Sequence, residues 1–393
     1  MRIQRHAMIL LLAYAGFISL GLPDSVIGVA WPFIRRDFAL PLDALGLYFL
    51  VGTAGYFLAS MNSGRWVRRW GVGRILSFSG LLTALCLLGC AIAPNWIVIV
   101  TLSFAGGMGA GAIDAGINTY AAFRFTPRHV NWLHACWGIG AATGPAIMTA
   151  VIGARLSWRW GYLAIMAVLL VLTTGFFATQ KLWALTETAD TPSAPHASRR
   201  RTLTLPAAWM SIALFFVYCG IESSTGQWAY SLLVESRGVS KITAGLWVSL
   251  YWGALTCGRF VIGSAANRAS PRTLLRLSII GATVGTAMLV FLRIRGMEAP
   301  ALALAGFSLA PIFPTLISLT PRRFEPVHVA NIVGFQVAGG SLGIALTPLA
   351  MGMLAARAGL EALPPALLFL CLLMGFLSER LAGNHPVAED SRG

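Results

Sequence analysis

Long apolar blocks separated by short polar segments run along almost the entire chain. Most blocks are close to the roughly 20 residues that an α-helix needs to cross about 30 Å of hydrocarbon. The pattern predicts an all-α membrane protein and not a β-barrel, whose strands would show shorter segments of alternating polarity. Twelve spans are expected, over residues 8–34, 44–63, 74–93, 97–120, 131–154, 161–180, 207–234, 243–263, 272–292, 299–319, 330–356 and 362–379.

The overall composition supports this interpretation. Of the 393 residues, 57% are hydrophobic and 11% are charged, whereas a soluble domain has about 25% charged residues. Arg2 and Arg5 precede a first apolar run that resembles a signal peptide. That run continues to Ile34 without a small-residue cleavage site, so it is interpreted as a retained span. The six cysteines fall in apolar blocks without metal-ligand spacing to histidine, so no metal site is expected.

One long polar segment divides the blocks into two sets of six. Residues 181–206 are rich in Thr, Ser, Ala and Pro and include three consecutive arginines, which is typical of a solvated linker. We therefore predict an N-terminal six-helix bundle over 1–180, a cytoplasmic linker over 181–206, a C-terminal six-helix bundle over 207–380 and a cytoplasmic tail over 381–393.

The distribution of charge indicates an orientation. The net charge is +15, which in a soluble protein would suggest nucleic acid as a partner. Here most basic residues lie in short loops. With the N-terminus inside, the inward loops and tails carry about twice as many Lys and Arg residues as the outward loops. We therefore expect no nucleic-acid partner, a monomer surrounded by lipid, and both termini in the cytoplasm of a bacterium, with the chain in its inner membrane.

The two sets of spans resemble each other. Matching positions recur at an offset close to 198: residues 24–28 and 222–226, Gly140 and Gly339, Gly144 and Gly343. Parallel six-span repeats joined by a linker are the layout of the major facilitator superfamily. The loop over residues 64–74 is similar to that superfamily's basic loop signature, with Arg68 at a position that is usually acidic.

A run of small residues in span 4 carries the most informative polar groups. Within residues 106–120, steps of three or four residues put four side chains on one helix face: Gly107, Gly111, Asp114 and Asn118. The glycines would let a neighbouring helix approach closely. The acid and the amide would then face the space between helices. An ionised Asp at mid-bilayer costs roughly 2.5–3.5 kcal/mol, so its presence there indicates a function.

Of the fourteen acidic residues, only Asp24, Asp114 and Glu222 fall well inside spans. Loss of hydration favours the protonated form of a carboxyl group, so these three are the candidates for proton coupling. The alternative is an acid that only caps a polar contact between helices. Arg259 is the one basic residue inside a span. It is expected near the cytoplasmic surface, where it would snorkel to the interface without pairing with Glu222.

A second polar face opens span 5. Asn131 and His134 lie one helical turn apart with Trp137 beside them, and polar groups next to an indole suit a sugar. The candidate substrate-binding residues are Asp114, Asn118, Asn131, His134, Trp137, Gln227, Trp228, Tyr251 and Gln336. For the last four, simple packing between helices is an equal alternative.

The chain resembles the fucose–proton symporter family of the major facilitators over three segments, residues 113–118, 129–140 and 222–228. The resemblance implies twelve spans, alternating access, and uptake of a monosaccharide driven by H⁺, or by Na⁺ in some members. It also implies coupling roles at Asp24 and Asp114. Two positions that face the sugar in the family correspond to His134 and Trp137, where family members commonly carry carboxamides.

The sequence contains no nucleotide-binding loop, zinc-spaced histidine pair or nucleophile elbow, so an enzyme is not expected. The predicted function is proton-coupled import of a monosaccharide or a similar small polar solute by alternating access, with no cofactor other than the coupling ion. Three alternatives stay open: a sodium-coupled sugar symporter, a proton-coupled antiporter that exports amphipathic compounds, and a transport-inactive sensor on the same scaffold.

Overall fold

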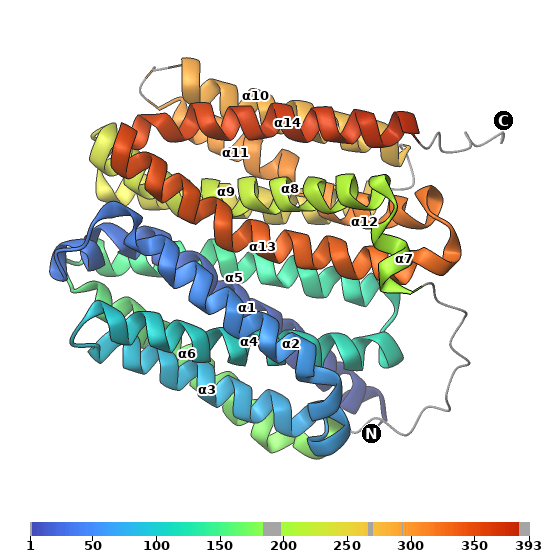
Figure 1. The fold of residues 1–393 in the computed structure, drawn as a ribbon. Helices are drawn as coiled ribbons and strands as arrows, with labels where there is room; N and C mark the ends of the chain where they lie inside the picture. Colours follow the sequence, from blue (N-terminus) through green and yellow to red (C-terminus); the bar gives the residue numbers. More distant parts are fainter. Residues whose placement is uncertain (1, 184–197, 266–269, 293, 295, 385–393) are drawn as a thin grey trace.

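The computed structural model describes residues 2–183, 198–265, 270–292, 294 and 296–384. These residues form helices and no strand, and the long helices run roughly side by side (Figure 1). The first group is α1 (Arg2–Asp37), α2 (Leu45–Trp70), α3 (Val72–Ile92), α4 (Trp96–Arg124), α5 (Pro127–Gly153) and α6 (Trp158–Thr179). The second group is α8 (Pro206–Ser231), α9 (Lys241–Ala265), α10 (Pro271–Phe291), α11 (Glu298–Leu309), α12 (Ile312–Arg323), α13 (Pro326–Ala358) and α14 (Leu363–Asn384).

Eleven stretches of the described residues are long and apolar enough to cross a membrane. α9 falls short because Arg259 and several aromatic and hydroxyl residues lower its hydropathy, yet its 25 residues run along α5. With α9 included, the helices give the twelve predicted spans. The tenth span is divided between α11 and α12, which meet at Pro311, since proline lacks the N–H that would continue the helix.

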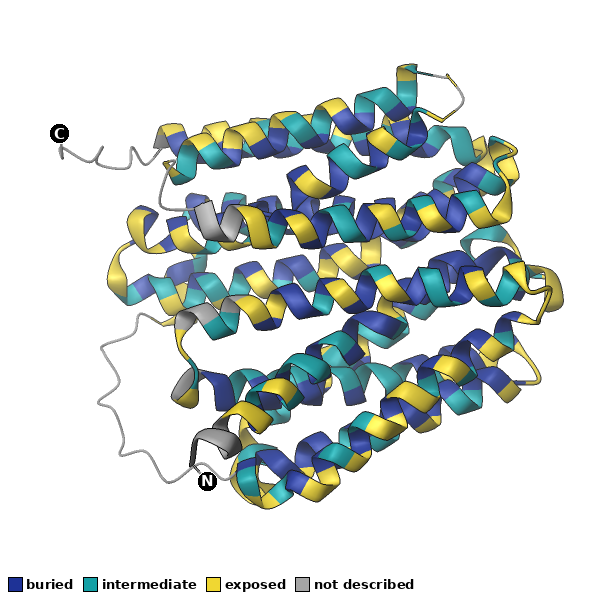
Figure 2. Ribbon diagram, turned by 180° about the vertical axis from the view of Figure 1, so that it is seen from behind, coloured by how far each residue is buried: buried dark blue, intermediate teal, exposed yellow. Residues whose placement is uncertain are grey.

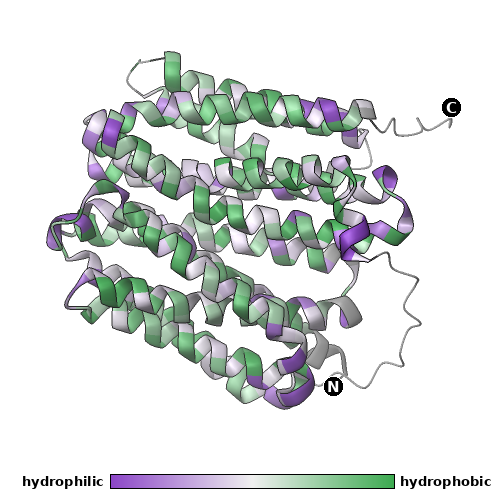
Figure 3. Ribbon diagram, in the orientation of Figure 1, coloured by the Kyte–Doolittle hydropathy of each residue, from purple (hydrophilic) through white to green (hydrophobic). Residues whose placement is uncertain are grey.

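The outer surface of the helices is apolar. Figure 3 shows hydrophobic residues along the helices and hydrophilic residues gathered at the two ends, and Figure 2 shows exposed residues along outward-facing sides. Ile97, Val171 and Phe291 are each 72–74% exposed. A soluble monomer rarely exposes apolar surface on this scale, so the protein is an integral membrane protein whose helices face lipid.

Glycines set the closest helix contacts, and they do so in the same way in both groups. A Cβ added at any of four glycines on α5 and α13 would come too close to a carbonyl oxygen of the partner helix, α1 or α8. The contacts are Gly140 with Ile18, Gly144 with Leu22, Gly339 with Ile212, and Gly343 with Phe216. The predicted correspondence of these glycines between the two sets of spans is confirmed.

The same contacts correct the register expected for spans 1 and 7. Ile212 corresponds to Ile18 at an offset of 194, not 198. Asp24 therefore corresponds to Tyr218, and Glu222 lies one helical turn further along α8. A shift of four residues keeps a side chain on nearly the same face of a helix, which is why matching sequence letters alone cannot detect it.

The start of α1 and the end of α14 lie at one end of the molecule, together with the short helix α7 (Arg199–Leu203) (Figure 1). We refer to this as the terminal end and to the other as the opposite end. Near the opposite end the two groups meet. Arg35 of α1 and Glu235, which follows α8, form an ion pair of 2.7 Å. Gly46 of α2 packs closely against Leu349 of α13.

Only part of the predicted linker, residues 181–206, lies within the described residues. Residues 184–197, and residues 385–393 of the predicted tail, lie outside the described residues. On one flank Trp183 is fully buried and packs against Tyr120. On the other, the buried Thr202 hydroxyl forms a hydrogen bond of 2.9 Å with Nδ1 of His328. Lys181 and residues 198–201 are exposed, whereas Trp183 and Thr202 have buried partners that the polar composition of the segment does not show.

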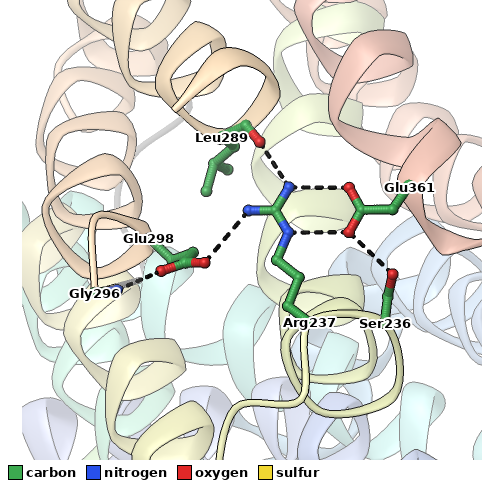
Figure 4. Close-up of polar contacts among 6 residues, drawn as sticks. All are labelled: Ser236, Arg237, Leu289, Gly296, Glu298 and Glu361. Carbon is green, nitrogen blue, oxygen red and sulfur yellow. Dashed lines mark hydrogen bonds and ion pairs between the residues drawn. The ribbon is translucent and has the colours of Figure 1, made fainter. Parts of the chain in front are cut away.

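At the opposite end of the molecule, a cluster of charged residues connects helices of the second group (Figure 4). Arg237 donates to the two carboxylate oxygens of Glu361 at 3.0 and 3.1 Å and to the carbonyl oxygen of Leu289 at 2.7 Å. Glu298 lies 3.8 Å from Nη1 of Arg237, and Ser236 donates to Glu361 at 2.9 Å. We refer to these five residues as the Arg237 cluster.

Candidate substrate and coupling site

Asp114 lies on the face of α4 that packs against α2. The two helices approach closely, because a Cβ at Gly107 would collide with the carbonyl oxygen of Gly52, and one at Gly111 would collide with that of Tyr56. The prediction that this glycine face admits a neighbouring helix is confirmed. As a consequence Asp114 faces a protein neighbour and not lipid.

Both carboxylate oxygens of Asp114 accept hydrogen bonds. The Tyr56 hydroxyl donates to Oδ2 at 2.6 Å, and the side-chain amide of Asn118 donates to Oδ1 at 2.9 Å. Two donors, one from α2 and one from α4, therefore act on the same carboxylate. Asp114 is held in a defined orientation by these two contacts.

Gly111→Val should push α2 away from α4, since the added carbons would meet the Tyr56 backbone. Overpacking of this kind lowers the free energy of unfolding by about 1–3 kcal/mol, and we expect a lower melting temperature of the purified protein. Gly334→Val on α13 is the matched control, because nothing lies within 4 Å of a Cβ at Gly334. Equal melting temperatures for the two variants would contradict the close contact.

Asp24 lies in α1 at the boundary between the two helix groups. Its Oδ2 accepts a hydrogen bond of 3.1 Å from the indole N–H of Trp137 in α5. Its backbone carbonyl accepts one of 2.7 Å from the side chain of Gln227 in α8. Asp24 is exposed, and it lies close enough to Asp114 for the two carboxyl groups to interact electrostatically. The structure thus brings the two predicted coupling acids of spans 1 and 4 near each other.

Glu222 of α8 and Arg259 of α9 form an ion pair, with 3.4 Å between Oε1 and Nη2. Tyr218 donates to the other carboxylate oxygen of Glu222. The expectation that Arg259 does not pair with Glu222 is therefore wrong. Side chains on a helix lean toward its N-terminus, and α8 and α9 run in opposite directions. The two side chains lean toward each other, which a depth estimate from position along the helix misses.

Trp137 connects these two charged sites. Its indole N–H binds Asp24, and the guanidinium carbon of Arg259 lies 5.2 Å from the centre of its ring. Trp252 of α9 packs edge-on against it, with 5.7 Å between ring centres. Trp137 therefore stands between an acid of the first group and a base of the second.

His134 lies at the same boundary. It is exposed, and its ring packs edge-on against Phe17 at 5.3 Å between ring centres. The charge of Arg259 acts on it across the boundary. His134 thus faces the same region as Trp137, one turn away on α5. The side chain of Asn131, the other candidate at the start of this helix, lies outside the described residues.

Four further candidates are enclosed in this conformation, each at most 4% exposed: Gln227, Trp228, Tyr251 and Gln336. Tyr251 donates to the backbone carbonyl of Glu222 at 2.8 Å. The side-chain amide of Gln336 donates to Ser211 at 2.6 Å and to Thr320 at 2.9 Å. In this conformation the four side chains contact other protein groups. Their contact with a substrate stays a prediction.

Two tyrosines at the site, Tyr56 and Tyr218, are not among the candidates that the sequence indicates. Each donates its hydroxyl to a carboxylate inside a span, Asp114 and Glu222 respectively. A tyrosine within a membrane helix needs a partner for its hydroxyl, so its presence in a span indicates that a polar group lies nearby. The partner depends on which helices are neighbours, and the sequence does not state this.

Two small cavities lie inside the helix groups. A cavity lined by Ser19, Pro23, Thr83 and Thr173 in the first group measures about 10 Å³. Another, lined by Thr225, Trp228 and Leu367 in the second group, measures about 20 Å³. Each has room for about one water molecule, which is too little for a sugar. The exposed polar residues at the boundary between the groups are the better candidate site.

The sequence matches the Major Facilitator Superfamily over residues 13–298 and 210–390. Together these matches cover most of the chain. The protein therefore belongs to the Major Facilitator Superfamily, and it is a membrane transporter and not an enzyme.

One relative is the glucose/mannose transporter GlcP of Bacillus subtilis, which is 21% identical over 360 residues that cover 87% of this chain and 86% of GlcP. A D-xylose–proton symporter structure has a TM-score of 0.78 at 13% identity and covers 97% of this chain and 98% of its own. The E. coli fucose–proton symporter FucP has a TM-score of 0.62 at 15% identity, covering 95% and 99%. These likenesses confirm the predicted fold.

Proposed function

We propose that the protein is a secondary active transporter that moves a monosaccharide together with H⁺ by alternating access. The observation that carries the proposal is Asp24, an exposed acid between the two helix groups whose carboxylate binds the indole of Trp137. An acid at this boundary can exchange a proton with water on either side as the groups rock. The adjacent indole provides an apolar face beside the polar group.

A sugar fits the chemistry of these residues. Sugar hydroxyls need both donors and acceptors, which Asp24 and His134 supply, and the C–H face of a sugar ring packs against an indole such as Trp137. GlcP is named as a glucose/mannose transporter, and two solved neighbours are named as sugar–proton symporters. These names support a sugar as the substrate class.

We further propose that the chain works as a monomer in a bacterial inner membrane with both termini in the cytoplasm, as the distribution of basic residues favours. In that orientation the opposite end, held by Arg35 and Glu235, is the outer end. The conformation described above would then be closed toward the outside.

Uptake into liposomes that contain the purified protein tests the proposal. Radiolabelled glucose, mannose, xylose and fucose are offered with an inward H⁺ gradient, an inward Na⁺ gradient, or neither. We expect at least one sugar to accumulate with the H⁺ gradient, and a protonophore to abolish that accumulation. Accumulation with Na⁺ alone would overturn proton coupling in favour of the sodium symporter. Proton-driven extrusion of amphipathic dyes without sugar uptake would favour the exporter.

A further inference from the structure

The ion pair between Glu222 and Arg259 is a loose one. The ion-pair contact between the two side chains is 3.4 Å long, whereas a tight charge-assisted bond between a guanidinium and a carboxylate measures about 2.7–2.9 Å. The side chain of Arg259 is 17% exposed and that of Glu222 is 13% exposed. The contact uses Nη2, and a guanidinium offers five N–H donors in a planar fork. Arg259 can therefore present donors to a second anion.

Arg259 also lies beside the residues proposed to bind the sugar. Its guanidinium sits over the ring of Trp137, whose N–H binds Asp24, and its charge acts on the exposed His134. Among the described residues that form this site, Arg259 is the one with a permanent positive charge. Asp24 and Arg259 both contact the indole of Trp137, the acid at its N–H and the base over its ring.

We propose that Arg259 is an anion-binding residue and that the substrate is a monosaccharide acid, whose carboxylate pairs with the guanidinium of Arg259. Glu222 occupies that guanidinium when no substrate is bound. The hydroxyl groups of the same sugar then face Asp24 and His134 across Trp137. This inference rests on the proposed transport of a monosaccharide and narrows its class to one that carries a carboxylate.

Binding of the substrate to Arg259 would be coupled to the uptake of a proton by Glu222. When the substrate carboxylate replaces Glu222 on the guanidinium, two carboxylates would share one base in a partly buried site. An unpaired buried carboxylate is costly, so Glu222 takes up one H⁺ as it leaves. One proton therefore enters with one substrate anion, no covalent bond changes, and the charge of the site stays the same as before binding.

Other groups around Glu222 also bear on this step. The titratable or charged groups that face the pair are Tyr218 and Cys219 on α8, Tyr251 on α9 and His134 on α5, with Asp24 of α1 beyond Trp137. Of these, Tyr218 is the one that donates to Glu222. Its hydroxyl can stay hydrogen bonded to the protonated carboxyl, so the protonated state of Glu222 has a partner ready.

Ligand-induced thermal stabilisation of the full-length purified protein, with glucuronate and glucose as matched probes, tests the inference. We expect glucuronate to bind at least about tenfold more tightly than glucose, and more tightly at mildly acidic than at mildly alkaline pH. Glu222→Gln should bind glucuronate equally well at both pH values, because it can no longer take up a proton. Arg259→Gln should lose the preference for glucuronate.

Arg259→Gln leaves Glu222 without its base, so the variant can fail to fold. The double variant Arg259→Gln with Glu222→Gln avoids this by removing both charges, and it should be folded and still without preference for glucuronate. Arg276→Gln, at an exposed ion pair with Glu379, is the control and should bind like the wild type. Glucuronate binding that survives in the double variant would overturn the inference, as would wild-type protein that binds glucose and not glucuronate. In the second case proton-driven glucose uptake would leave the proposed function intact.

Discussion

Asp114→Asn should reduce proton-driven accumulation of the substrate to background while the protein remains folded and inserted. The amide is close in size to the carboxylate, so its oxygen can still accept from Tyr56, and its nitrogen can donate to the side-chain oxygen of Asn118 once the Asn118 amide turns over. What it cannot do is take up a proton. Loss of the titratable group therefore removes coupling and leaves the helix contact between α2 and α4 in place.

Counterflow separates the loss of coupling from loss of transport. In liposomes loaded with unlabelled substrate, Asp114→Asn should still exchange labelled substrate down its gradient, because that exchange needs no net movement of H⁺. Tyr56→Phe keeps the carboxyl group and removes one donor, so it should retain gradient-driven accumulation at a reduced rate. Accumulation by Asp114→Asn at the wild-type rate would show that Asp114 has no part in coupling.

Arg237→Ala should cause the largest loss of stability among the ion-pair variants. Arg237 is 10% exposed and Glu298 is 8% exposed, so removal of the guanidinium leaves Glu298 with an uncompensated charge. It also removes two hydrogen bonds to Glu361 and one to the carbonyl oxygen of Leu289 (Figure 4). Breaking a buried ion pair from one side costs about 3–5 kcal/mol. We expect a clearly lower melting temperature in detergent.

Arg276→Ala is the matched control for this comparison. Its ion pair with Glu379 is bidentate at 2.5 and 2.6 Å, but both side chains are 48% exposed. Exposed ion pairs contribute about 0–1 kcal/mol, so its melting temperature should be close to that of the wild type. The double change of Arg237→Ala with Glu298→Gln should recover part of the loss, since it removes the unpaired charge. An equal effect of the two arginine variants would contradict a structural role for the Arg237 cluster.

Much of the candidate site could be predicted from sequence because acids are rare inside spans. Asp24, Asp114 and Glu222 stand out from apolar surroundings, and the glycine face of α4 shows where a second helix packs. The structure adds the partners: Tyr56 for Asp114 and Arg259 for Glu222. These partners come from other helices, and residue spacing along one helix carries no information about the helix beside it.

The errors have physical reasons of the same kind. The register of spans 1 and 7 was predicted one turn away from the packing register, because residues four apart share a helix face. The separation predicted for Arg259 and Glu222 ignored the direction in which side chains lean on antiparallel helices. Polar composition likewise does not show that Trp183 and Thr202, on the flanks of the predicted linker, are buried against distant parts of the chain.

The sequence by itself determined the class of structure, because hydrocarbon thickness fixes helix length and lipid excludes charge. It also identified the packing glycines and the intramembrane acids. Only the tertiary structure decided that Trp137 stands between Asp24 and Arg259, and that Arg259 is paired with Glu222. Those contacts join α1, α5, α8 and α9. They follow from how the two helix groups are docked, which depends on all helix contacts together and not on any one segment.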